Sequence, residues 1–199
     1  NKKNELRATI HTAMLLSIYS GLFLTIIGVF GAKHILVLMQ TPPEVLPLAT
    51  LYLQVYFAGM IAMMVYNFGS AILRAKGDTK RPLYYLLFSG IINVILNLFF
   101  VIVFKMDVAG VALATVISTM IAAALVVRCM IHETEDFRLD LSKLKIDYNI
   151  LIKIVKIGVP AGLQGIVFSL SNVVIQSSIN SFGALVVAGN SAALNIEGF

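Results

Sequence analysis

The sequence predicts an all-α protein, a polytopic bundle of helices that cross a membrane. Its 199 residues are 59% hydrophobic and only 13% charged, whereas soluble domains are about 45–50% apolar and about 25% charged. With a mean hydropathy of +0.91, the chain has too little polar surface to cover itself in water. Its apolar runs reach the ~20 residues that a helix needs to span a bilayer, and they lack the alternating pattern of a membrane β-strand.

Helices are expected wherever a long apolar run lies between two breaks. We predict five complete helices, at about residues 9–39, 43–74, 82–104, 108–132 and 149–181, and the start of a sixth from about residue 184. Pro42 and Pro43 end the first helix, because proline cannot continue a helix but suits a first turn. Gly77 separates the second helix from the third, and Gly183 ends the fifth, since glycine readily leaves the helical φ range.

The longest polar stretch, ETEDFRLDLSKLKIDYN, follows the fourth predicted helix, and we expect it to be a linker. The chain begins with Asn1, without the layout of a secretory signal, and it ends at Phe199 inside an apolar run. We therefore expect it to be a piece of a longer protein. The single cysteine, Cys129, excludes an internal disulfide.

Lysine and arginine are unevenly distributed among the predicted loops. If the helices cross the membrane alternately, all of these residues except Lys33 and Lys105 fall on one side. Because basic loops stay in the cytoplasm, we predict that residue 1 is cytoplasmic, in a bacterial or archaeal plasma membrane. The loop charges also account for the pI near 9.4. We therefore expect the lipid bilayer, and no nucleic acid, as a partner of the chain.

The stretch LRAKGDTKRP, between the second and third helices, is strongly basic. We interpret it as a cytoplasmic stop between two spans, able to face anionic lipid headgroups. Arg74 and Asp78 are expected to pair across the turn. Pro160, which removes a backbone donor, is expected to bend the fifth helix. The residues to which we assign structural or topological roles are Arg74, Gly77, Asp78, Pro82 and Pro160.

Polar residues recur within the apolar helices. Steps of four place Tyr85, Ser89, Asn93 and Asn97 on one face of the third helix. The fourth helix carries Gly110, Ala114, Ser118 and Ala122 at the same spacing, which permits close helix packing. Thr115 lies beside that stripe. These polar groups either join helices by hydrogen bonds or line a water-filled cavity, and the pattern leaves both open.

The fifth helix is the most polar of the predicted spans. Its amides are Gln164, Asn172, Gln176 and Asn180, and the sixth helix carries Glu197, an acid within an apolar run. Intramembrane ionisable groups are functional by default. In contrast, no Ser-His-Asp spacing, paired carboxylates or phosphate-binding loop is present, and the three histidines are scattered along the chain without a cluster of metal ligands. We therefore expect neither an enzyme nor a metal site, and no cofactor.

Three segments resemble the multidrug and toxic compound extrusion (MATE) family. They are LRAKGDTKRP, then INVILNLFFVIVFKMDVAGVALATVIS, and finally the run that begins KIGVPAGLQGIVFSL. The resemblance covers nearly the whole chain and implies a MATE-like fold of two six-helix lobes. Residues 1–132 would be the later part of the N-terminal transmembrane lobe, 133–147 the cytoplasmic inter-lobe linker, and 148–199 the start of the C-terminal lobe.

The same resemblance implies candidate site residues. One branch of the family binds its coupling cation through an Asn, an Asp four residues later and a Thr on the next span. The matching residues are Asn93, Asn97 and Thr115, so the acid is replaced by an amide that cannot ionise. Another branch has a Glu early in the seventh span, and the matching region near Phe168 has no acid. Gln164, Asn172, Gln176, Asn180 and Glu197 complete the candidate cavity.

The resemblance implies a secondary antiporter that exports cationic or amphipathic drug-like compounds in exchange for H⁺ or Na⁺ by alternating access. One alternative is a lipid-linked oligosaccharide flippase of the related superfamily, which would need basic residues in its cavity. Another is a membrane scaffold that transports nothing. The polar row on the fifth helix argues against the scaffold.

Overall fold

The computed structural model describes residues 2–133 and 137–197, and at residues 2, 3 and 194–197 it describes the backbone alone. Within these residues every regular element is helical, which confirms the all-α prediction. The elements are α1 (Lys2–Leu38), α2 (Leu46–Ala58), α3 (Met60–Ala75), α4 (Lys80–Leu98), the π-helical turn η1 (Phe99–Val103), α5 (Asp107–Ile131), the 3₁₀ turn η2 (Leu141–Lys143), α6 (Tyr148–Asn180) and α7 (Ala184–Glu197).

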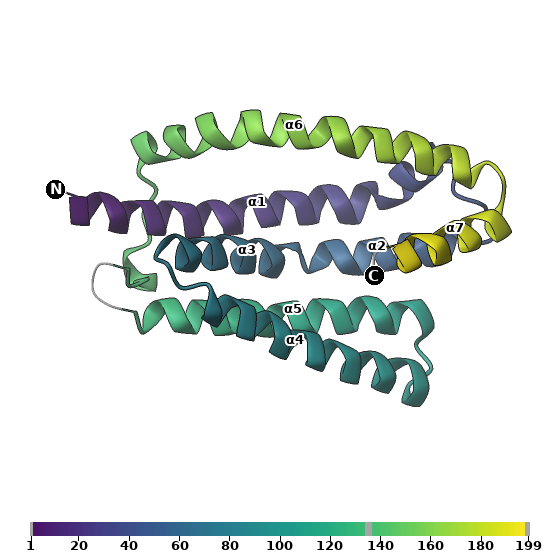
Figure 1. The fold of residues 1–199 in the computed structure, drawn as a ribbon, viewed down its shortest axis with the longest axis horizontal. Helices are drawn as coiled ribbons and strands as arrows, with labels where there is room; N and C mark the ends of the chain where they lie inside the picture. Colours follow the sequence, from purple (N-terminus) through teal and green to yellow (C-terminus); the bar gives the residue numbers. More distant parts are fainter. Residues whose placement is uncertain (1, 134–136, 198–199) are drawn as a thin grey trace.

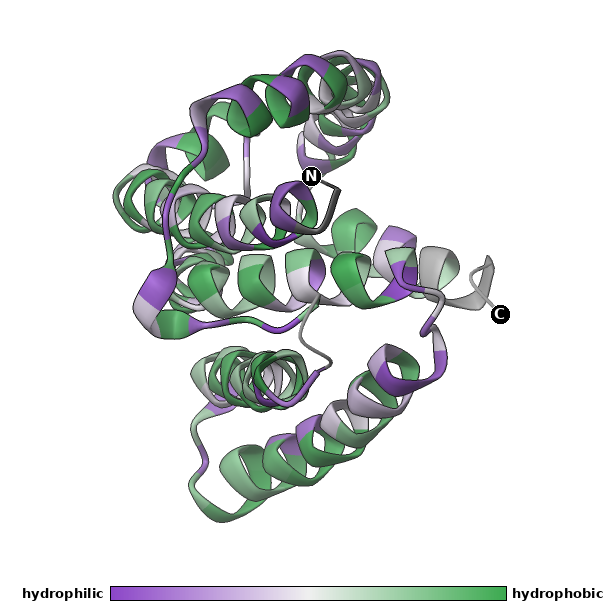
Figure 2. Ribbon diagram, turned by 90° about the vertical axis from the view of Figure 1, so that its left-hand side faces the viewer, coloured by the Kyte–Doolittle hydropathy of each residue, from purple (hydrophilic) through white to green (hydrophobic). Residues whose placement is uncertain are grey.

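The helices lie roughly side by side along one axis (Figure 1). The row formed by α2 and α3 lies between α1 on one side and the α4–α5 pair on the other, and α6 runs along the far side of α1. Figure 2 shows α4 and α5 as largely hydrophobic, whereas hydrophilic residues recur along α6. The layers therefore separate the two sets of polar residues that the sequence singles out.

Four helical stretches within the described residues are long and apolar enough to span a membrane: Asn4–Leu38, Lys80–Val103, Asp107–Ile131 and Tyr148–Asn180. The pair α2 and α3 supplies a fifth span, bent by 49° at its break. Ala184–Ala193 is a shorter apolar helix. The protein is therefore an integral membrane protein, and these four or five apolar helical spans agree with the predicted polytopic bundle.

The second span differs from the single helix predicted over 43–74. It begins at Leu46 and is interrupted at Gly59, whose ψ of 0° leaves the helical path. A Cβ at Gly59 would lie 2.7 Å from a methyl carbon of Val116 on α5. The absence of a side chain therefore allows α5 to pack against the break. Hydrogen bonding resumes when the Met63 amide donates to the Gly59 carbonyl at 3.2 Å.

Two glycines end helices as predicted. Gly77 has a φ of +95° and Gly183 a φ of +93°, a left-handed conformation that costs glycine little. Gly77 follows α3 and turns the chain toward α4, and Gly183 separates α6 from α7. In contrast, α6 continues as one helix through Pro160.

The hydrophobic core lies at the end of the molecule that carries the N-terminus. It is formed by side chains from α1, α3, α5 and the linker: Ile10, Met14, Leu73, Val126, Cys129, Met130 and Leu139. Leu139, which lies after α5, is only 1% exposed, and its amide donates to the Met130 carbonyl at 3.0 Å. The linker is thus attached to the bundle at Leu139.

Four charged side chains form ion pairs with one another, and we call them the Glu133 cluster: Lys76, Asp78, Arg81 and Glu133. Glu133, just after α5, forms ion pairs with both Lys76 and Arg81. Arg81 also pairs with Asp78, so the predicted pairing of Asp78 with Arg74 is wrong. Asp78 pairs with Arg81 because Arg81 lies three residues later in the first turn of α4, where its backbone amide also donates to the Asp78 carboxylate at 3.2 Å.

The linker is attached to α1 by two neighbouring side chains. The backbone amide of Asp140 donates to Nε2 of His11 at 3.3 Å, and that of Asp147 donates to Oγ1 of the buried Thr12 at 3.0 Å. Asp147 then caps α6, since its carboxylate accepts from the amide of Asn149 at 3.0 Å. These contacts fix where α6 begins.

The basic loops gather at one end of the bundle. The N-terminus, the α3–α4 turn and the linker all lie at the same end (Figure 1), whereas α4 and α5 are joined at the opposite end, where Lys105 lies. This is the arrangement that alternate crossing requires. Which end faces the cytoplasm stays a prediction.

Candidate functional site

Three residues singled out in the sequence meet between α4 and α5. Nδ2 of Asn97 donates to Oδ1 of Asn93 at 3.0 Å. Nδ2 of Asn93 in turn lies 3.4 Å from Oγ1 of Thr115 and 3.3 Å from Oγ of Ser118. We call Asn93, Asn97, Thr115 and Ser118 the asparagine cluster.

Small residues make this contact possible. The stripe on α5 that was predicted to permit close packing is buried, with Ala114 at 0%, Ser118 at 5% and Ala122 at 2% exposure. Gly110 continues it, and a Cβ there would lie 2.9 Å from Cβ of Phe100 in η1. The short side chains bring the α5 backbone close enough to α4 for the Asn93 amide to reach two hydroxyl groups.

The asparagine cluster has one oxygen that the described residues leave without a partner. Oδ1 of Asn97 is inaccessible to solvent and accepts no hydrogen bond from the described part of the chain. A buried acceptor without a donor costs free energy, about 1–3 kcal/mol. Such an oxygen is suited to a cation or to a donor from a ligand or another chain segment.

Chemically, the asparagine cluster consists of amides and hydroxyls. None of the four side chains titrates near neutral pH, so they cannot carry a proton in the way that a carboxylate does. Their oxygens are, however, the hard neutral ligands that hard cations such as alkali and alkaline-earth ions accept. The asparagine cluster therefore offers oxygen ligands but no group that exchanges a proton near neutral pH.

The amides of α6 do not join the asparagine cluster. Gln164 and Asn172 are exposed along α6. Nε2 of Gln176 donates to Oδ1 of Asn180 at 2.8 Å, and Nδ2 of Asn180 donates to the carbonyl of Met39 at 2.8 Å. Asn180, which is 7% exposed, therefore joins the end of α6 to the end of α1. The α1 and α3 helices lie between α6 and the α4–α5 pair (Figure 1).

Glu197 is the last residue of α7. Its side chain lies outside the described residues, so its expected role as an intramembrane acid stays a prediction.

Ser118 belongs to the site but was assigned in the sequence only to the small-residue stripe. Its hydroxyl also donates to the carbonyl of Thr115 at 2.9 Å. The sequence could have indicated this role, because Thr115 and Ser118 are three residues apart and residues at that spacing share a helix face. What the pattern could not show was that Asn93 would reach Thr115 and Ser118 together.

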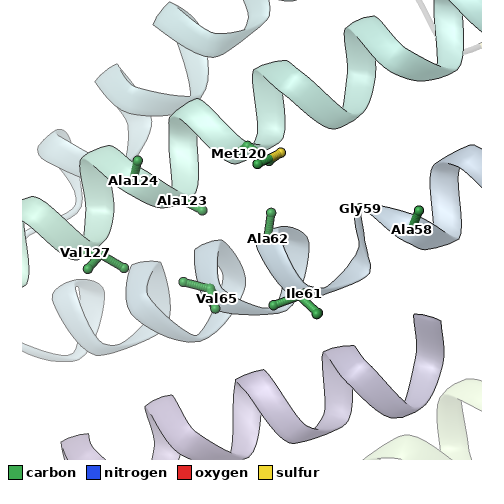
Figure 3. Close-up of a pocket in the computed structure, with 9 residues that line it drawn as sticks. All are labelled: Ala58, Gly59, Ile61, Ala62, Val65, Met120, Ala123, Ala124 and Val127. Atoms are coloured by element: carbon green, nitrogen blue, oxygen red, sulfur yellow. The ribbon is translucent and has the colours of Figure 1, made fainter. Parts of the chain in front are cut away.

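An apolar pocket of about 460 Å³ lies beside the break at Gly59 (Figure 3). It is lined by Ala58, Gly59, Ile61, Ala62, Val65, Met120, Ala123, Ala124 and Val127, from the α2–α3 span and α5. Met120 follows Thr115 by five residues, about 140° around α5. The pocket and the asparagine cluster therefore lie on different faces of α5, and the pocket offers no polar side chain to orient a ligand.

Comparisons with known proteins agree with this architecture. The family model described as MatE matches residues 1–99. The probable multidrug resistance protein YpnP of Bacillus subtilis (strain 168) is 37% identical over 171 residues, which are 85% of this chain and 38% of that protein. The chain belongs to the MATE family. A second MATE-like relative, the probable multidrug resistance protein YoeA of the same organism, is 33% identical over 94% of this chain and 42% of its own length.

A solved structure extends the match to three dimensions. It is described as the inward-facing conformation of a multidrug resistance MATE family transporter of the MOP superfamily, and it superimposes with a TM-score of 0.74 at 20% identity. The match covers 96% of this chain and 50% of that one. At this identity the likeness shows the MATE fold alone. The chain spans well under half the length of the curated MATE relatives it matches.

Proposed function

We propose that this chain is the middle part of a secondary antiporter that exports cationic or amphipathic drug-like compounds in exchange for a cation. Residues 1–132 would form the later part of the N-terminal lobe, 133–147 the cytoplasmic linker and 148–199 the start of the C-terminal lobe. Membership of the MATE family and the names of the curated relatives support drug export. The observation that carries the site assignment is the asparagine cluster with its unpartnered Asn97 oxygen.

Alternating access requires that ligands bind the two conformations with different affinity. A cation bound at Asn93, Asn97 and Thr115 would give Oδ1 of Asn97 a partner. It would therefore favour the conformation in which the oxygen atoms of these residues lie closest to the ion. The drug would bind nearby, between the lobes, with Gln164, Asn172, Gln176 and Asn180 lining the second-lobe side. Occupation of one site would thereby shift the affinity of the other.

Between the two coupling ions, the asparagine cluster favours Na⁺. Its four side chains are neutral and supply oxygen atoms, whereas H⁺ coupling needs a group that titrates. Within this sequence Glu197 is the candidate for such a group. No observation favours the flippase alternative, since the asparagine cluster contains no basic side chain for a pyrophosphate.

The test uses the full-length gene in a bacterial host that lacks its own drug pumps. Expression is expected to lower the accumulation of ethidium in a Na⁺-dependent way. Asn97→Leu, which removes the amide at similar volume, is expected to weaken the Na⁺ dependence at least about tenfold while the protein is still found in the membrane.

Thr50→Val is the matched control, because the Thr50 hydroxyl donates only to the Leu46 carbonyl of its own helix, at 2.7 Å. Dye efflux by the unmodified protein that does not respond to Na⁺ would reject the cation assignment. No efflux of any cationic dye, despite good membrane expression, would reject drug export itself.

A further inference from the structure

A polar cavity lies between α4 and α5, nearer the basic end of the bundle than the asparagine cluster. We call it the arginine groove. Its volume is about 340 Å³, and it is lined by Arg81, Tyr85, Leu125, Arg128, Cys129 and His132. Tyr85 and Asn93 are eight residues apart, or about 12 Å along α4, so the groove is separate from the asparagine cluster.

Arg81 is held in position within this groove. Its guanidinium pairs with Asp78 and Glu133, and Nη1 also donates to Sγ of Cys129 at 3.1 Å. Sulfur is a weak acceptor. The Nη1 group of Arg81 can therefore exchange Cys129 for a stronger acceptor more easily than the guanidinium can leave its carboxylate partners. The Arg81 side chain remains 43% exposed. A preorganised and accessible guanidinium loses less side-chain entropy when it binds an anion.

Arg128 adds a positive charge to the groove, and the acids of the Glu133 cluster do not neutralise it. Within that cluster, Lys76 and Arg81 match Asp78 and Glu133 in number. Arg128 lines the same groove from the last turn of α5, is exposed, and has no ion pair within the described part of the chain. His132 lies one turn later, with Nδ1 2.8 Å from the Arg128 carbonyl. Counted over the described residues, the groove is therefore net positive.

The position of the groove indicates the kind of anion. It lies at the end of two membrane-spanning helices, where the basic loops gather and where headgroups would lie (Figure 1). Further along α4 from Arg81, a run of large apolar side chains is exposed: Leu83 at 52%, Tyr84 at 61%, Leu87 at 56%, Phe88 at 51% and Ile91 at 61%. A phosphate in the groove would place attached acyl chains along this surface.

We propose that the arginine groove binds the phosphodiester headgroup of an anionic phospholipid. Arg81 and Arg128 contact the phosphate oxygens through their guanidinium groups, whose planar donors match phosphate geometry. The Tyr85 hydroxyl and the His132 ring complete the polar lining, and the acyl chains lie against α4. Basic pockets between helices at a membrane surface are suited to such headgroups. The inference does not depend on what the full-length protein transports.

The experiment is native mass spectrometry of the full-length protein in detergent, with phosphatidylglycerol or phosphatidylethanolamine added. The unmodified protein is expected to retain phosphatidylglycerol in preference to the zwitterionic lipid. The double variant Arg128→Gln with His132→Gln is expected to lower phosphatidylglycerol occupancy at least about fivefold without changing phosphatidylethanolamine occupancy. Both side chains are exposed, so their replacement should be tolerated by the fold.

Two single variants serve as matched controls, because each removes one exposed positive charge. Lys156→Gln does so on α6 at the basic end, and Lys105→Gln does so at the opposite end. Both are expected to retain phosphatidylglycerol. If Lys156→Gln loses the lipid to the same extent as the double variant, the proposal is overturned. The lipid would then be held by general electrostatic attraction to the basic end and not by the groove.

The unmodified protein provides an independent outcome, whatever the variants do. Equal retention of the two lipids would overturn the proposal. Displacement of phosphatidylglycerol by millimolar inorganic phosphate would also overturn it, because the groove would then be a site for free phosphate. Retention of phosphatidylglycerol against inorganic phosphate supports the lipid as the source of the anion.

Discussion

At the scale of single residues, Glu133 joins the end of α5 to the α3–α4 turn, a role that no pattern in the sequence indicated. Its side chain is only 4% exposed and pairs with Lys76 and Arg81, from the two sides of the α3–α4 turn. Burial alone would raise the pKa of Glu133, but the hydrogen bonds and charges of Lys76 and Arg81 outweigh burial, so the pKa is lowered overall. The pKa of Asp78 is lowered for a similar reason: burial raises it, and bonding to Arg81 outweighs that effect.

We predict that Glu133→Gln destabilises the protein by about 1–3 kcal/mol, because it removes the charged partner of two cations that remain partly buried. The measurement is the thermal unfolding of the full-length protein in detergent. Glu5→Gln is the control, since the Glu5–Lys153 pair lies at the surface with side chains 59% and 66% exposed and such pairs contribute little. Equal melting of Glu133→Gln and the unmodified protein would show that the Glu133 cluster adds nothing to stability.

The same ion pairs predict how stability depends on pH. A carboxyl whose pKa is lowered by folding stabilises the protein at pH values above its unfolded pKa, and that contribution is lost as the pH falls through the folded value. For Glu133, stabilisation should be complete above its ordinary pKa of 4.5 and decline below it. The melting temperatures of the unmodified protein and Glu133→Gln should therefore differ at pH 7 and converge as the pH falls below 4.5. A constant difference down to pH 3 would contradict this.

At the scale of helices, glycines decide which backbones touch. A Cβ at Gly21 on α1 would lie 2.6 Å from Cα of Ile61 on α3, a distance that only movement of the backbone can relieve. The approach of α1 to α3 therefore depends on this residue. At Gly90 on α4, by contrast, an added Cβ meets no atom within 4 Å.

This contrast makes a matched pair of substitutions. Gly21→Ala is expected to destabilise the protein by about 1–3 kcal/mol, because the two helices must separate. Gly90→Ala is expected to be neutral or to stabilise it by up to about 1 kcal/mol, because alanine is the better helix former. Fluorescence-detected size-exclusion chromatography after heating would compare the two. If both variants melt alike, the close contact between α1 and α3 is not a determinant of stability.

At the scale of the whole molecule, the bundle sorts its charges by end. The ion pairs join loops that are far apart in the sequence, such as Lys76 and Glu133, which are 57 residues apart. The linker lies across the same end and is bound to α1 at His11 and Thr12. The described part of the linker is therefore held against α1 at both Asp140 and Asp147.

The sorting of charges predicts the orientation in the membrane. Lys80→Cys and Lys105→Cys, introduced singly into a cysteine-free full-length protein, should react with an impermeant maleimide from opposite sides. Lys80→Cys should react in inside-out vesicles and Lys105→Cys in intact cells, because basic loops stay in the cytoplasm. Reaction of both from the same side would refute alternate crossing, and reaction in the reverse order would refute the cytoplasmic assignment of residue 1.

The sequence by itself determined the helices, their approximate ends and the small-residue face of α5. These features depend on local properties: hydrophobic runs, proline and glycine, and the 3.6-residue repeat. The same repeat predicted that Asn93 and Asn97 share a face, and the family resemblance added Thr115 to them. The contribution of Ser118 to the polar site was not predicted, because a serine is compatible with a packing stripe as well as with a polar site.

Only the tertiary structure decided which distant residues meet. It interrupts the second span at Gly59, pairs Asp78 with Arg81 in place of Arg74, joins Glu133 to the α3–α4 turn and places α6 on the far side of α1 from α4 and α5. A helical pattern specifies which face is polar or small but not which neighbour that face will contact. That choice depends on the complementarity of side chains brought together by the whole chain, and it separates the asparagine cluster from the amides of α6.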